Sequence, residues 1–218
     1  MTTHRPIFAT GEIYHVFNRS IGKEPLFHLK PNLDRIIELV NYYRFEQQIR
    51  FSHFIQLPEL LKRDYLRIEK TPLVDLYASS FMPNHYHFEI KQLQNNGISR
   101  FISNMQNSFA KFYNTKNDRN GGLFEDSFKA KIIKSTEEFI HINRYIHLNH
   151  VTSYLVTFEE LKSYSWSSLS WYVHPKLNKF INTDPVMNHF KTLERFLNFL
   201  QDQIDYQRKL RLIKKLIN

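Results

Sequence analysis

Apolar and polar positions alternate in some stretches of the chain and recur every three or four residues in others. Alternation predicts strands at residues 12–19, 73–81 and 85–91, with further strand material at 123–134. Spacings of three and four predict helices after Pro31-Asn32, over residues 97–115 and from Ser135 onward. Because the turn signal Pro83-Asn84 joins two strands as an antiparallel pair, the pattern predicts an α+β fold with helices packed on a central sheet.

The rest of the chain gives a weaker pattern. Residues 46–70 are ambiguous, with a helix indicated around Glu59 to Tyr65, and helices are predicted around 156–163 and 185–215. No Gly-, Pro- or Ser-rich linker interrupts the chain, and 218 residues are enough to bury a full core. We therefore expect one catalytic domain over residues 1–175 and a C-terminal helical extension over residues 176–218.

Two histidines stand two positions apart in the predicted strand 85–91. Side chains at i and i+2 leave the same face of a strand, so His85 and His87 can reach one ion, with Glu89 on the same outward face. The residues between and after them are predicted to pack on the core: Tyr86, Phe88 and Ile90. The alternative is an ordinary strand with two surface or core-edge histidines.

The helix predicted over residues 135–151 carries a second set of polar side chains. Its first turn has the Ser and Glu spacing of a capping box. Steps of four residues place His141, Tyr145 and Asn149 on one line of this helix. If that line faces the histidine strand, Asn149 supplies a third ligand and Tyr145 is placed to attack a phosphorus atom. The alternative for Tyr145 is a half-buried aromatic side chain.

At these two segments the chain resembles a known family. The sequence MPNHYHFEI resembles the histidine-hydrophobe-histidine motif of the HUH-type single-tyrosine transposases, and RYIHLNHV resembles their nucleophile helix. The similarity is greatest to the REP-associated tyrosine transposases. Weaker matches extend it over about residues 11–173: IYHVFNRS, GGLFEDSFKAKII and SYSWSSLSWY.

The resemblance implies a ferredoxin-like sheet and an enzyme that cleaves single-stranded DNA and transfers strands. Tyr145 would form a 5′-phosphotyrosine and release a 3′-hydroxyl, while His85, His87 and Asn149 would bind one divalent cation. The expected partner is single-stranded, hairpin-forming DNA. The sequence leaves open whether Tyr145 serves its own subunit's cation or, in a homodimer, that of a partner.

The chain departs from the family pattern in three places. His150 follows Asn149 where proline is usual, and a residue near Tyr154 replaces a common glycine. Asp126-Ser127 stands where the family has a glycine-arginine pair, so one arginine that would contact DNA is missing. None of these changes removes a candidate ligand or the nucleophile.

Other roles and functions remain open on the sequence alone. His141, one turn before Tyr145, is a candidate to assist ionisation of the phenol or an exposed helical histidine, and Tyr113 is the rival nucleophile. A catalytically inactive DNA-hairpin-binding protein would use the same basic surface without a cation. A metal-dependent phosphoesterase would turn over without a covalent intermediate.

Charge favours an anionic partner. Thirty Lys and Arg residues against 21 Asp and Glu residues give a formal net charge of +9, with a pI of about 9.6. The C-terminal segment alternates basic and apolar residues, a pattern typical of a helix on phosphates, on a partner helix or on a membrane surface, or of a solvated helix. The basic residues expected to bind DNA are Lys129, Lys131, Arg144, Arg208, Lys209 and Arg211.

The absence of cysteine excludes disulfides and thiolate metal sites. Imidazole and amide ligands suit Mg²⁺ or Mn²⁺, with Zn²⁺ as a further option. No segment has the apolar core of a signal peptide or the length of a membrane span, so we expect a cytoplasmic protein without a membrane partner.

Overall fold

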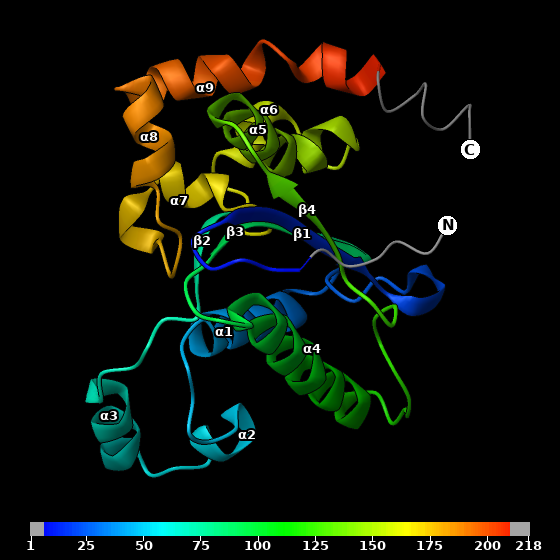
Figure 1. The fold of residues 1–218 in the computed structure, drawn as a ribbon. Coiled ribbons are helices and arrows are strands. Elements are labelled where there is room, and N and C mark those ends of the chain that lie inside the picture. Colours follow the sequence, from blue (N-terminus) through cyan, green and yellow to red (C-terminus); the bar gives the residue numbers. More distant parts are fainter. Residues whose placement is uncertain (1–6, 210–218) are drawn as a thin grey trace.

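A computed structural model describes residues 7–209 of the chain. At its centre lies a four-stranded antiparallel sheet in the order β2-β3-β1-β4 (Figure 1). The strands are β1 (Ile13–Arg19), β2 (Val74–Met82), β3 (His85–Gln92) and β4 (Lys129–Ile133). Helix α1 (Lys30–Tyr43) follows β1 and α4 (Gly97–Lys116) follows β3, which is the β-α-β-β-α-β order of a ferredoxin-like fold. The predicted α+β class is confirmed.

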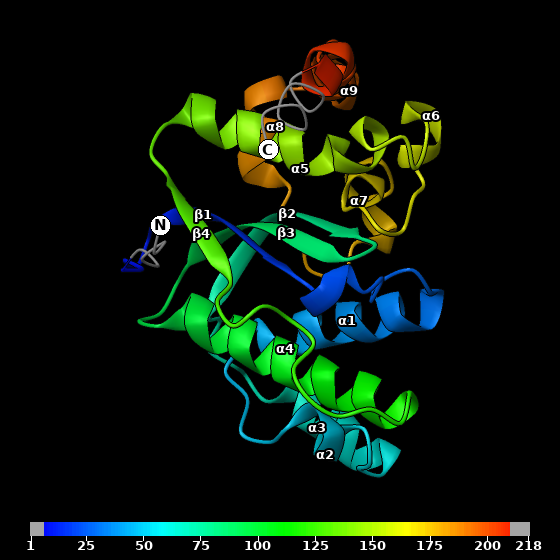
Figure 2. The ribbon, with the colours of Figure 1, turned by 90° about the vertical axis from the view of Figure 1, so that its right-hand side faces the viewer.

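Helices cover both faces of this sheet. Helices α1 and α4 pack on one face, and α5 (Thr136–Thr152) lies across the other (Figures 1 and 2). Beyond α1 and α4, away from the sheet, lie α2 (Phe51–Phe54) and α3 (Glu59–Arg67). The remaining elements are η1 (Ile21–Lys23), α6 (Phe158–Leu161), α7 (Leu169–Val173), η2 (Pro175–Leu177), α8 (Asp184–Phe190) and α9 (Leu193–Gln201).

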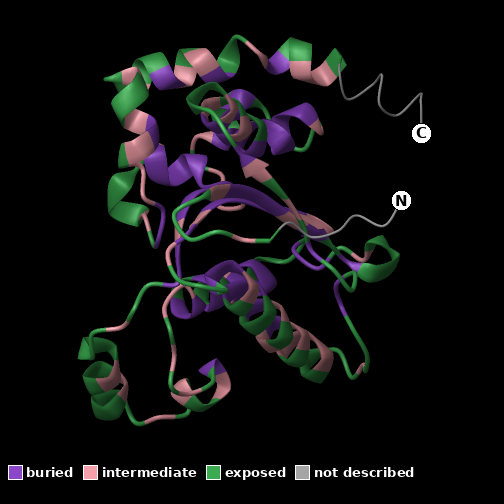
Figure 3. Cartoon of the chain, viewed as in Figure 1, coloured by how far each residue is buried: buried purple, intermediate pink, exposed green. Residues whose placement is uncertain are grey.

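The main apolar core lies between the sheet and α1 with α4. The predicted core residues of β3 are fully buried there: Tyr86, Phe88 and Ile90. The alternating residues Tyr14 and Val16 of β1 join them, and so do Phe101 and Met105 of α4. Burial is concentrated in the sheet and in the helix surfaces that touch it, whereas α3 has no buried residue (Figure 3). The hydrophobic pattern alone therefore identified this core.

The opposite face of β3 is not outward as the sequence suggested. His87 is 5% exposed and Glu89 is 0% exposed, because α5 lies over this face. A strand in the middle of a sheet with helices on both sides has no solvent face. The alternation in β3 therefore separates an apolar face from a buried polar face.

Both ends of α5 are capped. The Ser135 side chain accepts a hydrogen bond from the backbone N–H of Glu138, as the capping signal predicted. At the other end, the backbone N–H groups of Tyr154 and Leu155 donate to the carbonyls of Val151 and His150, which is a Schellman motif. Tyr154 has a φ of 58°, a backbone conformation that favours glycine.

Two predicted elements are shorter in the structure. Strand material predicted at 123–134 forms a strand only at Lys129–Ile133, and before it Phe124 forms an isolated antiparallel bridge with Ser20. The helix predicted over 185–215 is interrupted at Lys191, whose φ is 64°, and Thr192 caps the start of α9. The end of that prediction lies outside the described residues.

The C-terminal extension packs on the layer formed by α5 and α7. Phe196 of α9 is fully buried, with its ring 5.2 Å from that of Tyr172 and 6.0 Å from that of His147. The described part of the extension thus shares the core of the preceding residues. None of the helices within residues 7–209 is both long enough and apolar enough to cross a bilayer.

Candidate functional site

Strand pairing builds a polar patch on the sheet face beneath α5. In the register of β1 with β3, Arg19 lies opposite His85 and Phe17 lies opposite His87. Directly opposed residues of an antiparallel pair point to the same face, so these side chains share one surface. The rings of His85 and His87 are 5.1 Å apart between centroids. The two histidines predicted to act together are therefore neighbours in one patch.

A third histidine, His15 of β1, joins this patch, and sequence reasoning missed it. A hydrogen bond of 2.9 Å joins His15 Nε2 to His87 Nδ1. Burial, followed by the positive charge of Lys131, lowers the pKa of His15 to about 4. Burial, followed by the nearby charges of His15 and His85, lowers the pKa of His87 well below its usual value. Both rings are neutral at physiological pH.

Tyr145 approaches these imidazoles from α5. Its ring centroid lies 5.7 Å from that of His87 and 5.8 Å from that of His15, with the rings edge to face. The side chain is 39% exposed, so it is not enclosed by apolar packing and a large substrate can reach it. Asn149, one turn later, is buried, and its Nδ2 has no hydrogen-bond partner. The structure thus brings Tyr145 to the predicted histidines.

The histidine nitrogens fit a metal site. His85 Nδ1–H donates to Asn84 Oδ1 at 2.7 Å, and His87 Nδ1 is engaged by His15. His87 Nε2 is buried and has no partner. Histidine ligands commonly hold their second nitrogen in such a hydrogen bond, which fixes the ring and its tautomer.

Residues 7–209 contain no group of three or more His, Cys, Asp or Glu side chains arranged to hold a metal ion. A three-ligand site built on the two histidines therefore needs an amide such as that of Asn149. The assignment of His85, His87 and Asn149 as ligands stays a prediction.

Glu89 connects the patch to α5. Its Oε2 accepts a hydrogen bond of 2.7 Å from Asn143 Nδ2, and its Oε1 is buried without a partner. Burial raises the pKa of this carboxyl group well above its usual value. Glu89 therefore joins β3 to α5 through this hydrogen bond, and the raised pKa of its carboxyl group suits it poorly as a ligand for a cation.

Two further histidines of α5 are fully buried. His147 Nε2 lies 2.9 Å from Ser168 Oγ, and His150 Nε2 donates to the carbonyl of Phe81 at 3.2 Å. Burial lowers the pKa of His147 to about 3 and that of His150 to about 4. His150 is thus a neutral side chain that binds α5 to β2.

The rival nucleophile Tyr113 lies on α4, on the other side of the sheet (Figure 1). Its hydroxyl donates to Glu24 Oε1 at 2.8 Å, and burial together with this carboxylate raises its pKa. These surroundings disfavour the phenolate form of Tyr113, which a nucleophile needs. His141 is exposed, and its Nδ1 accepts a hydrogen bond of 2.6 Å from Arg144 Nη2, so its role as an assistant stays a prediction.

The predicted DNA-binding residues lie in three different surroundings. Lys129 and Lys131 are exposed on β4, at the edge of the sheet next to the histidine patch. Arg144 is buried, and its guanidinium lies 4.4 Å from the centroid of the Phe199 ring. In the C-terminal segment, Arg208 lies over the Tyr154 ring at 4.8 Å, Lys209 is exposed, and Arg211 is outside the described residues. The DNA-binding role of all six residues stays a prediction.

Arg19 is a basic residue of the patch that the sequence did not single out. It is exposed at the end of β1, and its charge contributes to the low pKa of His87. The alternation of β1 places it on one face with His15, but only the pairing with β3 shows that this is the histidine face.

The chain is similar to a known protein family and to solved structures. Residues 45–149 match the model of a family described as "Transposase IS200 like". A solved structure described as "Structure of the REP associates tyrosine transposase bound to a REP hairpin" is similar, with a TM-score of 0.54 and 15% sequence identity over 82% of this chain and 88% of that chain. No curated protein matches the chain. At this identity the structural likeness shows the fold alone.

Proposed function

We propose that the chain, whose residues 45–149 match the IS200-like transposase family, is an HUH-type tyrosine transposase that cleaves and rejoins single-stranded DNA through Tyr145. The observation that carries the proposal is the position of the phenol. It is partly exposed and stands edge-on to His87 and His15 at 5.7 and 5.8 Å between ring centroids.

The proposed reaction is an exchange of phosphate esters. The Tyr145 oxygen bonds to phosphorus in line with the bond to the 3′ oxygen, which breaks. The phenol loses its proton and the departing oxygen gains one, so the products are a 5′-phosphotyrosine and a 3′-hydroxyl. The ester energy is thus conserved for joining to another strand, which suits a transposase better than a phosphoesterase.

The residues around Tyr145 have separate tasks in this proposal. His85, His87 and Asn149 would hold one divalent cation, Mg²⁺ or Mn²⁺. When bound, this cation would neutralise charge on the non-bridging oxygens of the scissile phosphate. Arg19 and Lys131, exposed beside the patch, would attract the neighbouring phosphates.

Hairpin-forming DNA is the substrate that we favour. The structurally similar transposase has been solved with a REP hairpin bound, and the net charge of +9 suits a polyanionic partner. Asp126-Ser127 in place of the family's glycine-arginine pair favours a different choice of hairpin or sequence.

A covalent adduct tests the proposal. The protein is mixed with labelled single-stranded hairpin DNA and Mg²⁺ or Mn²⁺, and denaturing gels are examined for a slow, protease-sensitive band. We expect this band with the wild type and with Tyr113→Phe, and none with Tyr145→Phe, because Tyr145, unlike Tyr113, stands at His87 and His15.

Persistence of the band in Tyr145→Phe would refute the assignment. Hairpin binding by both the wild type and Tyr145→Phe, without cleavage by either, would identify a catalytically inactive binding protein. Multiple turnover without a band would identify a phosphoesterase.

A further inference from the structure

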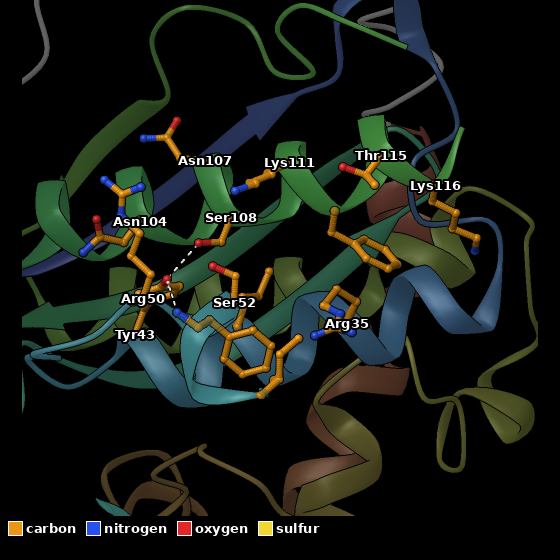
Figure 4. Close-up of a pocket in the computed structure, with 14 residues that line it drawn as sticks. Arg35, Tyr43, Arg50, Ser52, Asn104, Asn107, Ser108, Lys111, Thr115 and Lys116 are labelled. Carbon is orange, nitrogen blue, oxygen red and sulfur yellow. Dashed lines mark hydrogen bonds between the residues drawn. The ribbon is translucent and has the colours of Figure 1, made fainter. Parts of the chain in front are cut away.

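A cleft on the far side of the sheet from Tyr145 is a second candidate binding site. It lies between α1, α2 and α4 and has a volume of about 620 Å³ (Figure 4). That volume lies within the range of roughly 300 to 1,000 Å³ that is usual for ligand sites. The cleft therefore suits one or two unpaired nucleotides better than a duplex.

The charged residues that line this cleft are all basic. They are Arg35, Arg50, Lys111 and Lys116. Within residues 7–209, the exposed side chains of Arg50 and Lys111 have no ion pair or hydrogen bond. Two cations that the protein leaves uncompensated in a cleft favour an anionic ligand, because such a surface gathers counter-ions.

The cleft offers polar groups that can pair with base edges and apolar side chains against which a base can lie. Asn104, Asn107, Lys111 and Thr115 follow one another at steps of three or four along α4 and line one wall (Figure 4). Amides in such a row can pair with the edges of bases. Phe112 and other apolar side chains line the floor: Leu39, Phe51 and Ile55.

Contacts between the walls hold the cleft open. The hydroxyl of Tyr43 on α1 shares a hydrogen bond of 2.8 Å with Ser108 Oγ on α4 and accepts one of 3.0 Å from the backbone N–H of Phe51 on α2. The Arg35 guanidinium lies 5.2 Å from the centroid of the Phe51 ring and 4.9 Å from that of Phe112. Three helices are thus joined around a preformed space.

From these observations we infer that the cleft binds an unpaired stretch of single-stranded DNA, with phosphates on Arg50 and Lys111 and a base against Phe112. The choice of DNA rests on the proposed function. Cations beside an aromatic surface are the combination by which proteins bind single strands without sequence preference. The DNA would then contact both faces of the sheet, with Tyr145 acting on one and the cleft holding a distant segment on the other.

Binding without divalent cation tests this inference. In EDTA, the affinity for a fluorescent oligo-dT is measured at several salt concentrations for Arg50→Gln/Lys111→Gln. A matched control is Arg63→Gln/Lys176→Gln, which removes the same charge from two exposed positions outside the cleft. We expect the cleft variant to bind roughly tenfold more weakly, with a log-log salt slope smaller by about 1.4, since each contact with a single strand contributes about 0.7.

A cross-link locates the strand independently. Oligonucleotides carrying 5-iododeoxyuridine are irradiated with the wild-type protein, and the attached peptides are identified by mass spectrometry. We expect attachment within residues 97–116, around Phe112. Equal affinities of the two variants, or cross-links confined to the Tyr145 face, would overturn the inference. Displacement of the oligonucleotide by dTMP at equal molar concentration would also overturn it, since that would identify a site for free nucleotides.

These results are separable from those on the proposed function. A Tyr145 adduct together with normal binding by the cleft variant would refute only the inference about the cleft. Weakened binding by that variant without any adduct would refute only the proposed cleavage reaction. Thermal unfolding followed by circular dichroism on both double variants shows whether a loss of binding reflects loss of fold.

Discussion

Glu89 is a carboxyl group buried between β3 and α5, where it accepts a hydrogen bond from Asn143. Burial raises its pKa well above 4.5, so above that pH the folded protein holds a proton that the unfolded chain has lost. The folded pKa is the higher one. The stability that this group contributes is therefore complete below pH 4.5 and is lost as the pH rises toward the folded pKa.

Glu89→Gln should remove this pH dependence. The amide keeps an oxygen that can accept from Asn143, but it cannot ionise. We expect the variant to exceed the wild type in free energy of unfolding at pH 8, by an amount that grows by about 1.4 kcal/mol per pH unit above 4.5 until the folded pKa is reached. Urea unfolding in EDTA at pH 4.5, 6 and 8 measures the difference, and a constant difference would contradict the burial argument.

His15 is expected to act as a positioning residue through His87. Its Nε2 holds His87 Nδ1, so the other nitrogen of His87, which has no hydrogen-bond partner, is left for the proposed cation. Partners of this kind typically change metal affinity by about 10- to 100-fold. We expect His15→Phe to weaken Mn²⁺ binding, measured by electron paramagnetic resonance, by at least about tenfold. His15→Gln, which can still hydrogen-bond, should restore part of the affinity, whereas equal affinities in the two variants would exclude the positioning role.

At the scale of elements, α5 places Tyr145 beside the histidine patch. Its first turn is capped by Ser135, its inner side contacts β2 and β3 through His150 and Asn143, and its last turn ends in a Schellman motif. The position of Tyr145 over the histidines therefore depends on how both ends of one helix are held.

The end of α5 carries a testable strain. Tyr154 adopts a φ of 58°, a conformation that costs a residue with a Cβ roughly 1 to 2 kcal/mol. Because glycine and alanine both lack the ring that lies against Arg208, they can be compared directly. We expect Tyr154→Gly to be more stable than Tyr154→Ala by about 1 kcal/mol in urea unfolding.

A helical position provides the control for this comparison. Tyr206 is exposed in a helical stretch, where alanine is favoured over glycine by about 1 kcal/mol. The order should therefore reverse for Tyr206→Gly and Tyr206→Ala. If glycine were also less stable than alanine at position 154, backbone strain at the end of α5 would be excluded.

At the scale of the whole molecule, the net charge of +9 should dominate DNA affinity. Arg19, Lys129 and Lys131 are exposed on or beside the histidine patch. If all three neutralise phosphates, the logarithm of the binding constant should fall with the logarithm of salt with a slope of about −2 or steeper, since each contact with a single strand contributes about 0.7. Fluorescence anisotropy with single-stranded hairpin DNA between 50 and 300 mM NaCl measures this slope. A nearly flat dependence would exclude an electrostatic interface.

Local patterns determined most of the elements. The sequence predicted helix 97–115 and strand 85–91 almost to the residue. In the structure these elements span Gly97–Lys116 and His85–Gln92. Periodicity and caps depend on residues within one element, so they can be read without the fold. The described part of segment 185–215 is mostly helical, as predicted, but the break at Lys191 was not foreseen, because a single residue with positive φ leaves the apolar spacing almost unchanged.

The sequence by itself also determined which two segments carry the candidate chemistry, since the H-x-H spacing and the Tyr145 to Asn149 spacing are local. Only tertiary structure decided what surrounds them. The hydrogen-bond partner of His87 is His15, 72 residues away in the sequence, because β3 pairs with β1 as well as with β2. The docking of α5 buried Glu89, and α9 covered Arg144 with Phe199. Strand register and helix packing depend on shape and burial across distant segments, and no spacing within one segment encodes them.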